Sequence, residues 1–164
     1  MFFIIRHLII NQFTMKKLIF LFCFIILSCS KDETRIECEY TEKICSAIEE
    51  LNFNKKKWVD SNITSYSMNF RVSCFCGFFD PFSVTVLENT TDKVSGNEEW
   101  GYEGLPLTIN DLFIEIERRI YEDPFSFQVG YDTKYGYPES SFFDMIEMMA
   151  DEETGYYVTD FNPL

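Results

Sequence analysis

Hydrophobic residues recur along this chain with two spacings, one typical of helices and one typical of strands. In residues 41–60 they stand three or four positions apart, at Ile44, Ala47, Ile48 and Leu51. This spacing predicts an amphipathic helix. Residues 108–121 repeat it with Ile109, Leu112, Phe113, Ile116 and Ile120. Thr108 and Asp111 form a capping-box pattern there, and the segment predicts a second helix.

Alternation of apolar and polar residues predicts the strands. It is clearest over 64–76, where the apolar positions are Tyr66, Met68, Phe70, Val72, Cys74 and Cys76. A period of two over this length indicates a half-buried antiparallel strand. Similar runs predict further strands in 82–87, 125–131 and 156–161, and a return strand from Lys93 to Ser95. Periodicity does not assign 139–149.

The order helix, two or three strands, helix, then two or three strands predicts an α+β fold. We expect an antiparallel sheet of about four to six strands with the helices packed on one face. The other face would then carry polar side chains, from Ser65, Ser67, Asn69, Arg71, Thr85, Ser126 and Gln128.

A short apolar run near the amino end predicts export. Leu18–Leu27 has ten residues and follows Met15-Lys16-Lys17. It is too short to cross a bilayer, which needs about 20 residues, but it suits the core of a signal peptide. The run ends in Ile26-Leu27-Ser28-Cys29, which resembles the lipobox of bacterial lipoproteins. We therefore expect cleavage before Cys29 and acylation of its thiol; an ordinary signal peptide or a buried helix is the alternative.

These features predict three parts. Residues 1–28 are a signal peptide, 29–40 form a lipidated tether, and 41–164 form one α+β domain. We expect synthesis to start at Met15; the alternative is a start at Met1, which would give the signal peptide a long amino-terminal region. Serine after the acylated cysteine resembles the pattern of outer-membrane lipoproteins. We expect a cell-envelope protein on the periplasmic side or at the surface, with the membrane and another envelope protein as partners.

The net charge and the histidine content restrict the partners and the reaction mechanisms that are open to the mature chain. All 27 acidic residues but only 11 of the 14 basic ones follow residue 28, which gives the mature chain a net charge of −16. Such a surface repels phosphate backbones, so we expect no nucleic-acid partner. The one histidine, His7, is removed with the signal. Ser-His-Asp and Cys-His mechanisms and histidine-ligated metals are thereby excluded from the mature chain.

We therefore expect a non-enzymatic binding or structural domain without cofactor, metal or catalytic residues. One alternative is a hydrolase that uses carboxylates, with Asp132, Asp144 or Glu153 as candidates. The other is calcium binding by Asp151-Glu152-Glu153, although a calcium-loop spacing is missing.

Four cysteines remain besides Cys29: Cys38, Cys45, Cys74 and Cys76. An even number in an exported domain favours disulfides over a redox pair or a thiolate metal site. Cys74 and Cys76 would lie about 6.6–6.8 Å apart along one strand, at the upper limit for a disulfide. Cys38 and Cys45 reach each other only if the helix begins after about residue 41. Two cross-links from the amino-terminal segment to the strand are the alternative.

Residues 129–138 are the most distinctive stretch of the domain. Gly136 is suited to a positive φ, and Asp132 after a strand end is suited to an Asx turn. The stretch predicts a tight, aromatic-packed connection between strands. A ligand edge lined by Tyr131, Asp132, Tyr135 and Tyr137 is the alternative.

Several motifs occur here in a fixed order. They are Trp58 before Tyr66 and Met68, then Cys74 and Cys76, Val84 and Val86, Thr108–Phe113, Tyr131-Asp132 with Tyr135–Pro138, Asp144, Asp151–Glu153, and Tyr157, Thr159 and Phe161. In this order they resemble a family of bacterial proteins described only as a domain of unknown function, many of them lipoproteins. The resemblance covers about 58–162. It implies a strand in Glu139–Asp144 and local disulfides, Cys74–Cys76 and Cys38–Cys45, and it brings no known activity.

Overall fold

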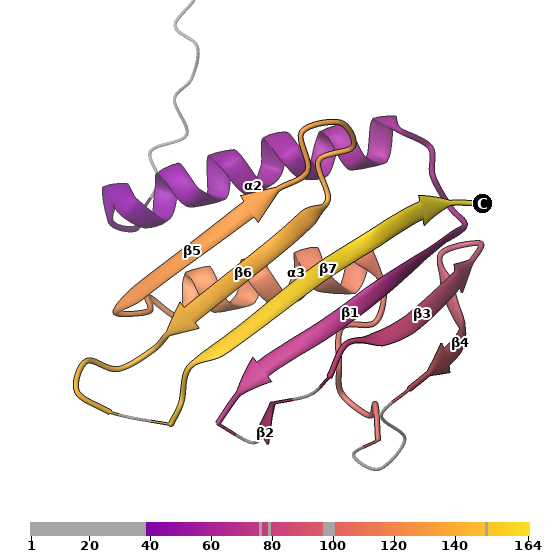
Figure 1. Cartoon of the computed structure of the whole chain (residues 1–164). Coiled ribbons are helices and arrows are strands. Elements are labelled where there is room, and N and C mark those ends of the chain that lie inside the picture. Colours follow the sequence, from indigo (N-terminus) through magenta and orange to yellow (C-terminus); the bar gives the residue numbers. More distant parts are fainter. Residues whose placement is uncertain (1–38, 76, 79, 97–100, 150) are drawn as a thin grey trace, which may run out of the picture. The chain divides into compact units, whose positions relative to one another are not determined.

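A computed structural model gives the structure of the protein and describes residues 39–164, with gaps at 76, 79, 97–100 and 150 (Figure 1). The predicted signal peptide, the anchor Cys29 and residues 30–38 of the tether lie outside this part. The described helices are α2 (Glu42–Asp60) and α3 (Ile109–Tyr121). The strands are β1 (Tyr66–Cys74), β2 (Gly77–Phe78), β3 (Phe82–Leu87), β4 (Thr90–Ser95), β5 (Ser126–Tyr131), β6 (Pro138–Asp144) and β7 (Thr154–Pro163).

The strands form one antiparallel sheet in the order β4-β3-β1-β7-β6-β5, with β2 paired to β1. β7 comes after all the other described strands in the sequence, yet it lies between β1 and β6 in the sheet (Figure 1). It therefore joins a group built from β1, β3 and β4 to the β5–β6 hairpin. Phe70 shows the register, because it lies opposite Phe82 on one side and Val158 on the other.

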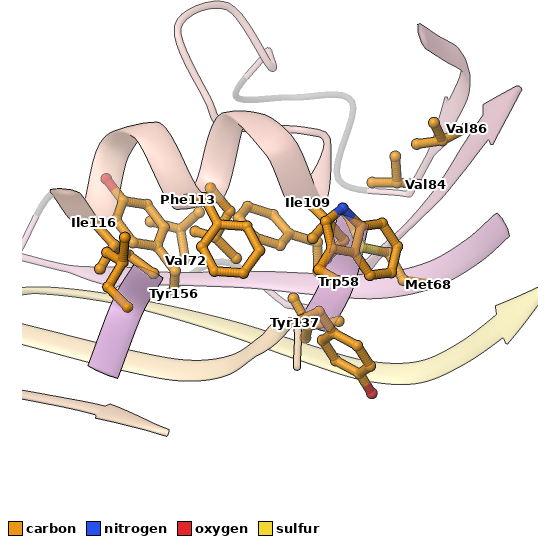
Figure 2. Close-up of a cluster of buried hydrophobic side chains, with 14 of the residues drawn as sticks. Trp58, Met68, Val72, Val84, Val86, Ile109, Phe113, Ile116, Tyr137 and Tyr156 are labelled. Atoms are coloured by element: carbon orange, nitrogen blue, oxygen red, sulfur yellow. The ribbon is translucent and has the colours of Figure 1, made fainter. Parts of the chain in front are cut away.

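The buried side chains of the helices and the sheet form one hydrophobic core (Figure 2). The alternate positions of β1 from Tyr66 to Val72 and the apolar stripe of α3 are buried as predicted, whereas Cys74 is half-buried. Trp58 is also buried, with 3% of its surface exposed. The buried members of these elements are Tyr66, Met68, Phe70 and Val72 from β1, Phe82, Val84 and Val86 from β3, and Ile109, Leu112, Phe113, Ile116 and Ile120 from α3.

The predicted polar positions of the sheet are accessible to solvent. Gln128 is exposed and the other six are half-buried. The Asn69 amide donates to Asp160 at 2.7 Å and accepts from the Ser83 hydroxyl at 2.9 Å. The Arg71 guanidinium lies 4.1 Å from the centre of the Tyr157 ring. The polar side chains of this face therefore bond mainly to one another across neighbouring strands.

The α+β fold with an antiparallel sheet is confirmed, and the placement of both helices on one face stays a prediction. α2 begins after Thr41, which caps it, and Thr108 and Asp111 form the predicted capping box of α3. Pro138–Asp144 is a strand, as the family resemblance implied. The prediction for Phe125 was wrong in one respect: β5 begins one residue later, and Phe125 is 51% exposed.

Candidate functional site

The β5–β6 connection is the tight turn that the sequence predicts, and Asp132 holds it together. Its side chain accepts hydrogen bonds from the backbone N–H groups of Lys134, at 3.0 Å, and Tyr135. Its backbone carbonyl accepts from Gly136 at 3.0 Å, and its N–H donates to the Tyr137 carbonyl at 2.8 Å. These are the bonds of an Asx turn. Asp132 is therefore the turn acceptor that its position predicts.

Gly136 allows this turn to lie directly against α2. Its φ is +79°, the left-handed region that favours glycine. A Cβ at this position would lie 2.6 Å from the carbonyl oxygen of Asn54 and 3.0 Å from Cβ of Lys57. The Lys57 ammonium also donates to the Thr133 carbonyl. The turn is thus attached to the helix at two points.

The tyrosines of the turn pack against rings from other elements. Tyr137 is 7% exposed and stacks on Phe161 of β7 with ring centres 4.4 Å apart. Trp58 of α2 meets Tyr137 edge-on at 6.4 Å, and Tyr135 lies 5.9 Å from Phe161. Tyr131 instead stacks on the ring of Phe113 in α3, with ring centres 6.4 Å apart. The structure brings Tyr135 and Tyr137 together and places Tyr131 elsewhere.

Most of the side chains of the predicted ligand edge make contacts within the domain. Tyr131, Asp132 and Tyr135 are half-buried and Tyr137 is buried. The exposed Lys134 lies over the Tyr135 ring, 4.4 Å from its centre, and donates to its hydroxyl at 2.6 Å. These contacts favour the packed connection, and a ligand edge of Tyr131, Asp132, Tyr135 and Tyr137 stays a prediction.

Burial raises the pKa of several tyrosines. It raises the pKa of Tyr66 and Tyr137 to about 12, from the ordinary 10, and it also raises the pKa of Tyr131 and Tyr156. The Tyr66 hydroxyl accepts the N–H of Ile109 at 2.8 Å, a bond that partly offsets the effect of burial. The folded chain therefore holds these protons more tightly than the unfolded chain does.

The tighter binding of these tyrosine protons in the folded chain predicts that the domain loses stability at alkaline pH. The contribution of these tyrosines to stability is constant below about pH 10 and falls as the pH rises toward 12, because the unfolded chain loses these protons first. In a titration followed at 295 nm, we expect part of the nine tyrosines to ionise only as the chain unfolds. The Tyr66→Phe variant should lose one of the late-titrating groups. Ionisation of all nine tyrosines near pH 10, with the circular dichroism unchanged, would contradict the prediction.

Two of the three carboxylates suggested for hydrolysis lie far apart. Asp132 follows β5, whereas Asp144 ends β6 and pairs with Ser126 at the start of β5. Six residue steps separate Pro138 from Asp144, a span of about 20 Å along a strand. Paired catalytic carboxylates lie about 5–10 Å apart. Asp132 and Asp144 therefore do not form such a pair.

Asp144 has another partner, Glu152, which the sequence analysis names only as a candidate calcium ligand. The Glu152 carboxylate accepts the N–H groups of Met145 at 3.0 Å and Ile146 at 2.7 Å. Loss of hydration and the hydrogen bond with Glu152 raise the pKa of Asp144. Loss of hydration acts the same way on Glu152, but its two N–H donors outweigh it and lower the pKa of that carboxyl. The acidic run hinted at Glu152, but its register with Asp144 is visible only in the fold.

The candidate calcium ligands bond to the backbone of their own loop. Glu152 caps Met145 and Ile146, and the Glu153 side chain accepts the N–H of Asp151 at 3.2 Å. Within the described residues, no three side chains of His, Cys, Asp or Glu are grouped to hold a metal ion. The carboxylates of Glu152 and Glu153 thus contribute to the loop structure.

A half-buried ionic network lies on α3. Arg119 donates to Glu115 at 2.6 Å, and Arg118 and the Tyr156 hydroxyl also donate to Glu115. The i, i+4 spacing of Glu115 and Arg119 predicts an ion pair on the exposed side of the helix, but the two side chains are only 20% and 15% exposed. The addition of Tyr156 from β7 explains the difference. Burial alone would raise the pKa of Glu115, but the bonds from Arg118 and Arg119 outweigh it and hold the pKa below its usual value.

Glu115→Gln tests this network. The lowered pKa means that the carboxylate stabilises the fold above its ordinary pKa and that this contribution is lost as the pH falls through the folded value. We expect the variant to lose about 1 kcal/mol at pH 7, since solvent still screens the pair, and to approach the parent as the pH falls below the lowered pKa of Glu115. Urea unfolding at pH 7 and at a pH below that pKa measures this. Glu49→Gln, at an exposed position of α2, should change little at either pH; an equal loss there would contradict a role of the network.

Residues 50–163 match the model of a family of unknown function, DUF6174. The chain belongs to DUF6174. No curated protein and no solved structure matches it. The predicted resemblance to a family of unknown function is confirmed, whereas the bacterial origin and the lipoprotein nature of its members stay predictions. The DUF6174 match begins inside α2 and extends to β7, so it includes the whole sheet and the rings around Phe161.

The cysteines of this DUF6174 chain are described in part. Cys45 in α2 and Cys74 at the end of β1 are half-buried, and Cys29, Cys38 and Cys76 lie outside the described residues. α2 begins at Glu42, which meets the condition under which Cys38 and Cys45 can reach each other. The pairs Cys74–Cys76 and Cys38–Cys45 stay predictions. In the part that the structure describes, no helix is long and apolar enough to cross a membrane.

Proposed function

We propose that this DUF6174 chain is a lipid-anchored protein of the cell envelope that presents a non-enzymatic binding or structural domain. The observation that carries the proposal is Ile26-Leu27-Ser28-Cys29 behind a ten-residue apolar run and a basic start. Two or three acyl chains on Cys29 would hold the protein stably, because each buried methylene adds roughly 0.8 kcal/mol. The proposed location is the outer membrane, and the proposed partner is another envelope component.

The contacts of the acidic side chains support the non-enzymatic part of this proposal. Asp132 holds the β5–β6 turn, Glu152 caps the β6–β7 loop, and Glu115 joins α3 to β7. Each of these carboxylates accepts hydrogen bonds that fix the backbone or connect elements. Their positions are explained by the stability of the fold without reference to a substrate.

The anchor is tested on the whole chain expressed in a Gram-negative host. We expect intact mass to show a mature protein that begins at Cys29 and carries two or three acyl chains. Cys29→Ala should remain uncleaved at this site and unlabelled by a fatty-acid probe. A mature protein that begins at another residue, or an unacylated Cys29, would refute the proposal. The mass of the uncleaved Cys29→Ala protein shows whether synthesis starts at Met1 or Met15.

We further propose that the remaining cysteines form the local disulfides Cys38–Cys45 and Cys74–Cys76. Two observations support this proposal: α2 begins at Glu42, the condition under which Cys38 and Cys45 can reach each other, and the family resemblance includes Cys74 and Cys76. Peptide mapping without reduction should recover both linked pairs. Recovery of peptides that join the amino-terminal segment to β1 would favour the alternative connectivity.

A further inference from the structure

Three exposed aromatic side chains gather where the tether enters the domain. Tyr40 is 52% exposed, Tyr121 40% and Phe125 51%, and the rings of Tyr40 and Tyr121 lie 5.0 Å apart. Lys43, one turn beyond Tyr40, donates to the Phe125 carbonyl at 3.2 Å. The first turn of α2 and the start of β5 lie at the same end of the domain (Figure 1). Tyr40, Tyr121 and Phe125 are called the entry patch.

The chemistry of the entry patch suits an uncharged interface between water and lipid. Tyrosine presents an apolar ring and a polar hydroxyl, and for this reason it is enriched where membranes meet water. Four exposed carboxylates lie next to the patch in the sequence, on Glu39, Glu42, Glu122 and Asp123. They repel an anionic surface. The Lys43 ammonium, which donates to the carbonyls of Pro124 and Phe125, carries one positive charge beside the patch and is outnumbered by these carboxylates.

The tether is short enough for the lipid surface that holds Cys29 to reach the entry patch. Eleven residues, 30–40, separate Cys29 from the domain, and an extended chain of this length spans at most about 40 Å. A short covalent connection gives the groups at its two ends an effective concentration on the order of millimolar. A surface that holds Cys29 therefore meets the entry patch far more often than a freely diffusing partner does, and weak contacts suffice.

We infer that the entry patch rests on the zwitterionic lipid surface that holds the anchor, which fixes the orientation of the domain on the membrane. This inference rests on the proposed lipid anchoring. Each ring that leaves water on contact would strengthen membrane retention about fivefold, given the area that a half-exposed ring can bury.

The test replaces the acyl anchor with one whose attachment does not depend on the cell. Residues 29–164 carrying Cys29→Ser and an amino-terminal histidine tag are bound to phosphatidylcholine vesicles that contain a nickel-chelating lipid. The rate of release after addition of imidazole is measured for the parent, for Phe125→Ser and for Tyr121→Ser. Phe53→Ser is the matched control, because Phe53 is 70% exposed on another face of α2. Circular dichroism confirms that each variant is folded.

We expect both patch variants to leave these vesicles about fivefold faster than the parent, and Phe53→Ser to leave at the parent rate. Vesicles with added anionic lipid should retain the parent less well at low salt. Equal release rates for all four proteins, or an equal effect of Phe53→Ser, would overturn the inference. So would patch variants that are impaired only in capturing a protein from envelope extract. Since nickel replaces acylation, failure here is distinguishable from failure of the proposed anchoring.

Discussion

Replacing Trp58 with alanine is expected to lower the free energy of unfolding by about 3–5 kcal/mol, the range measured for large aromatic residues in cores. Trp58 lies edge-on to Tyr66 at 5.6 Å, to Phe161 at 5.8 Å and to Tyr137 at 6.4 Å, so its removal leaves a cavity where α2 meets the sheet. Its indole N–H also donates to Asn110 at 3.0 Å. Equilibrium unfolding in urea measures the loss.

The control for this variant lies one and a half turns earlier on the same helix. Phe53 is 70% exposed, and Phe53→Ala removes an aromatic ring of similar size from a position that faces solvent. We expect a change of at most about 0.5 kcal/mol. If both variants lose the same stability, helix propensity rather than the aromatic cluster around Trp58 would explain the result.

Gly136→Ala is expected to destabilise the domain by about 3 kcal/mol. Part of the cost is the positive φ of +79°, which a residue with a Cβ adopts at a cost of about 1–2 kcal/mol. The rest comes from the new Cβ, which would lie 2.6 Å from the Asn54 carbonyl oxygen and push the turn off α2. Chemical denaturation of the variant gives the sum of both costs.

Gly104→Ala separates the two costs. Gly104 has nearly the same φ, +80°, but a Cβ there would meet no atom of the described residues within 4 Å. This variant should therefore show only the conformational cost, about 1–2 kcal/mol. A loss at Gly136 no larger than the loss at Gly104 would mean that the contact with α2 contributes nothing.

Local patterns predicted most of the secondary structure because an amphipathic period depends on neighbouring residues alone. The buried stripe from Ile109 to Ile120 and the alternation from Tyr66 to Val72 both follow from this period. The pairing between distant strands does not depend on neighbouring residues, so no local pattern predicts it. Only the sheet register places Phe70 of β1 opposite Val158 of β7.

The same reason explains what was misjudged on α3 and β5. Arg119 and Glu115 were expected to be exposed because a helix wheel does not show the tyrosine that β7 brings to them. Phe125 was expected to continue an alternating strand, but the edge strand begins at Ser126, after a loop held by Lys43. Long-range packing decided both cases, and in both it changed the exposure of a side chain rather than the type of element.

The central place of β7 has a consequence for the timing of folding. Its ten residues, Thr154–Pro163, hydrogen-bond to both β1 and β6, and they follow every other strand in the sequence. A growing chain that lacks them holds only separate fragments of the sheet, each with an unpaired edge. The sheet is therefore completed only when β7 pairs with both β1 and β6, a step that also adds the buried side chains of Tyr156 and Val158 to the core.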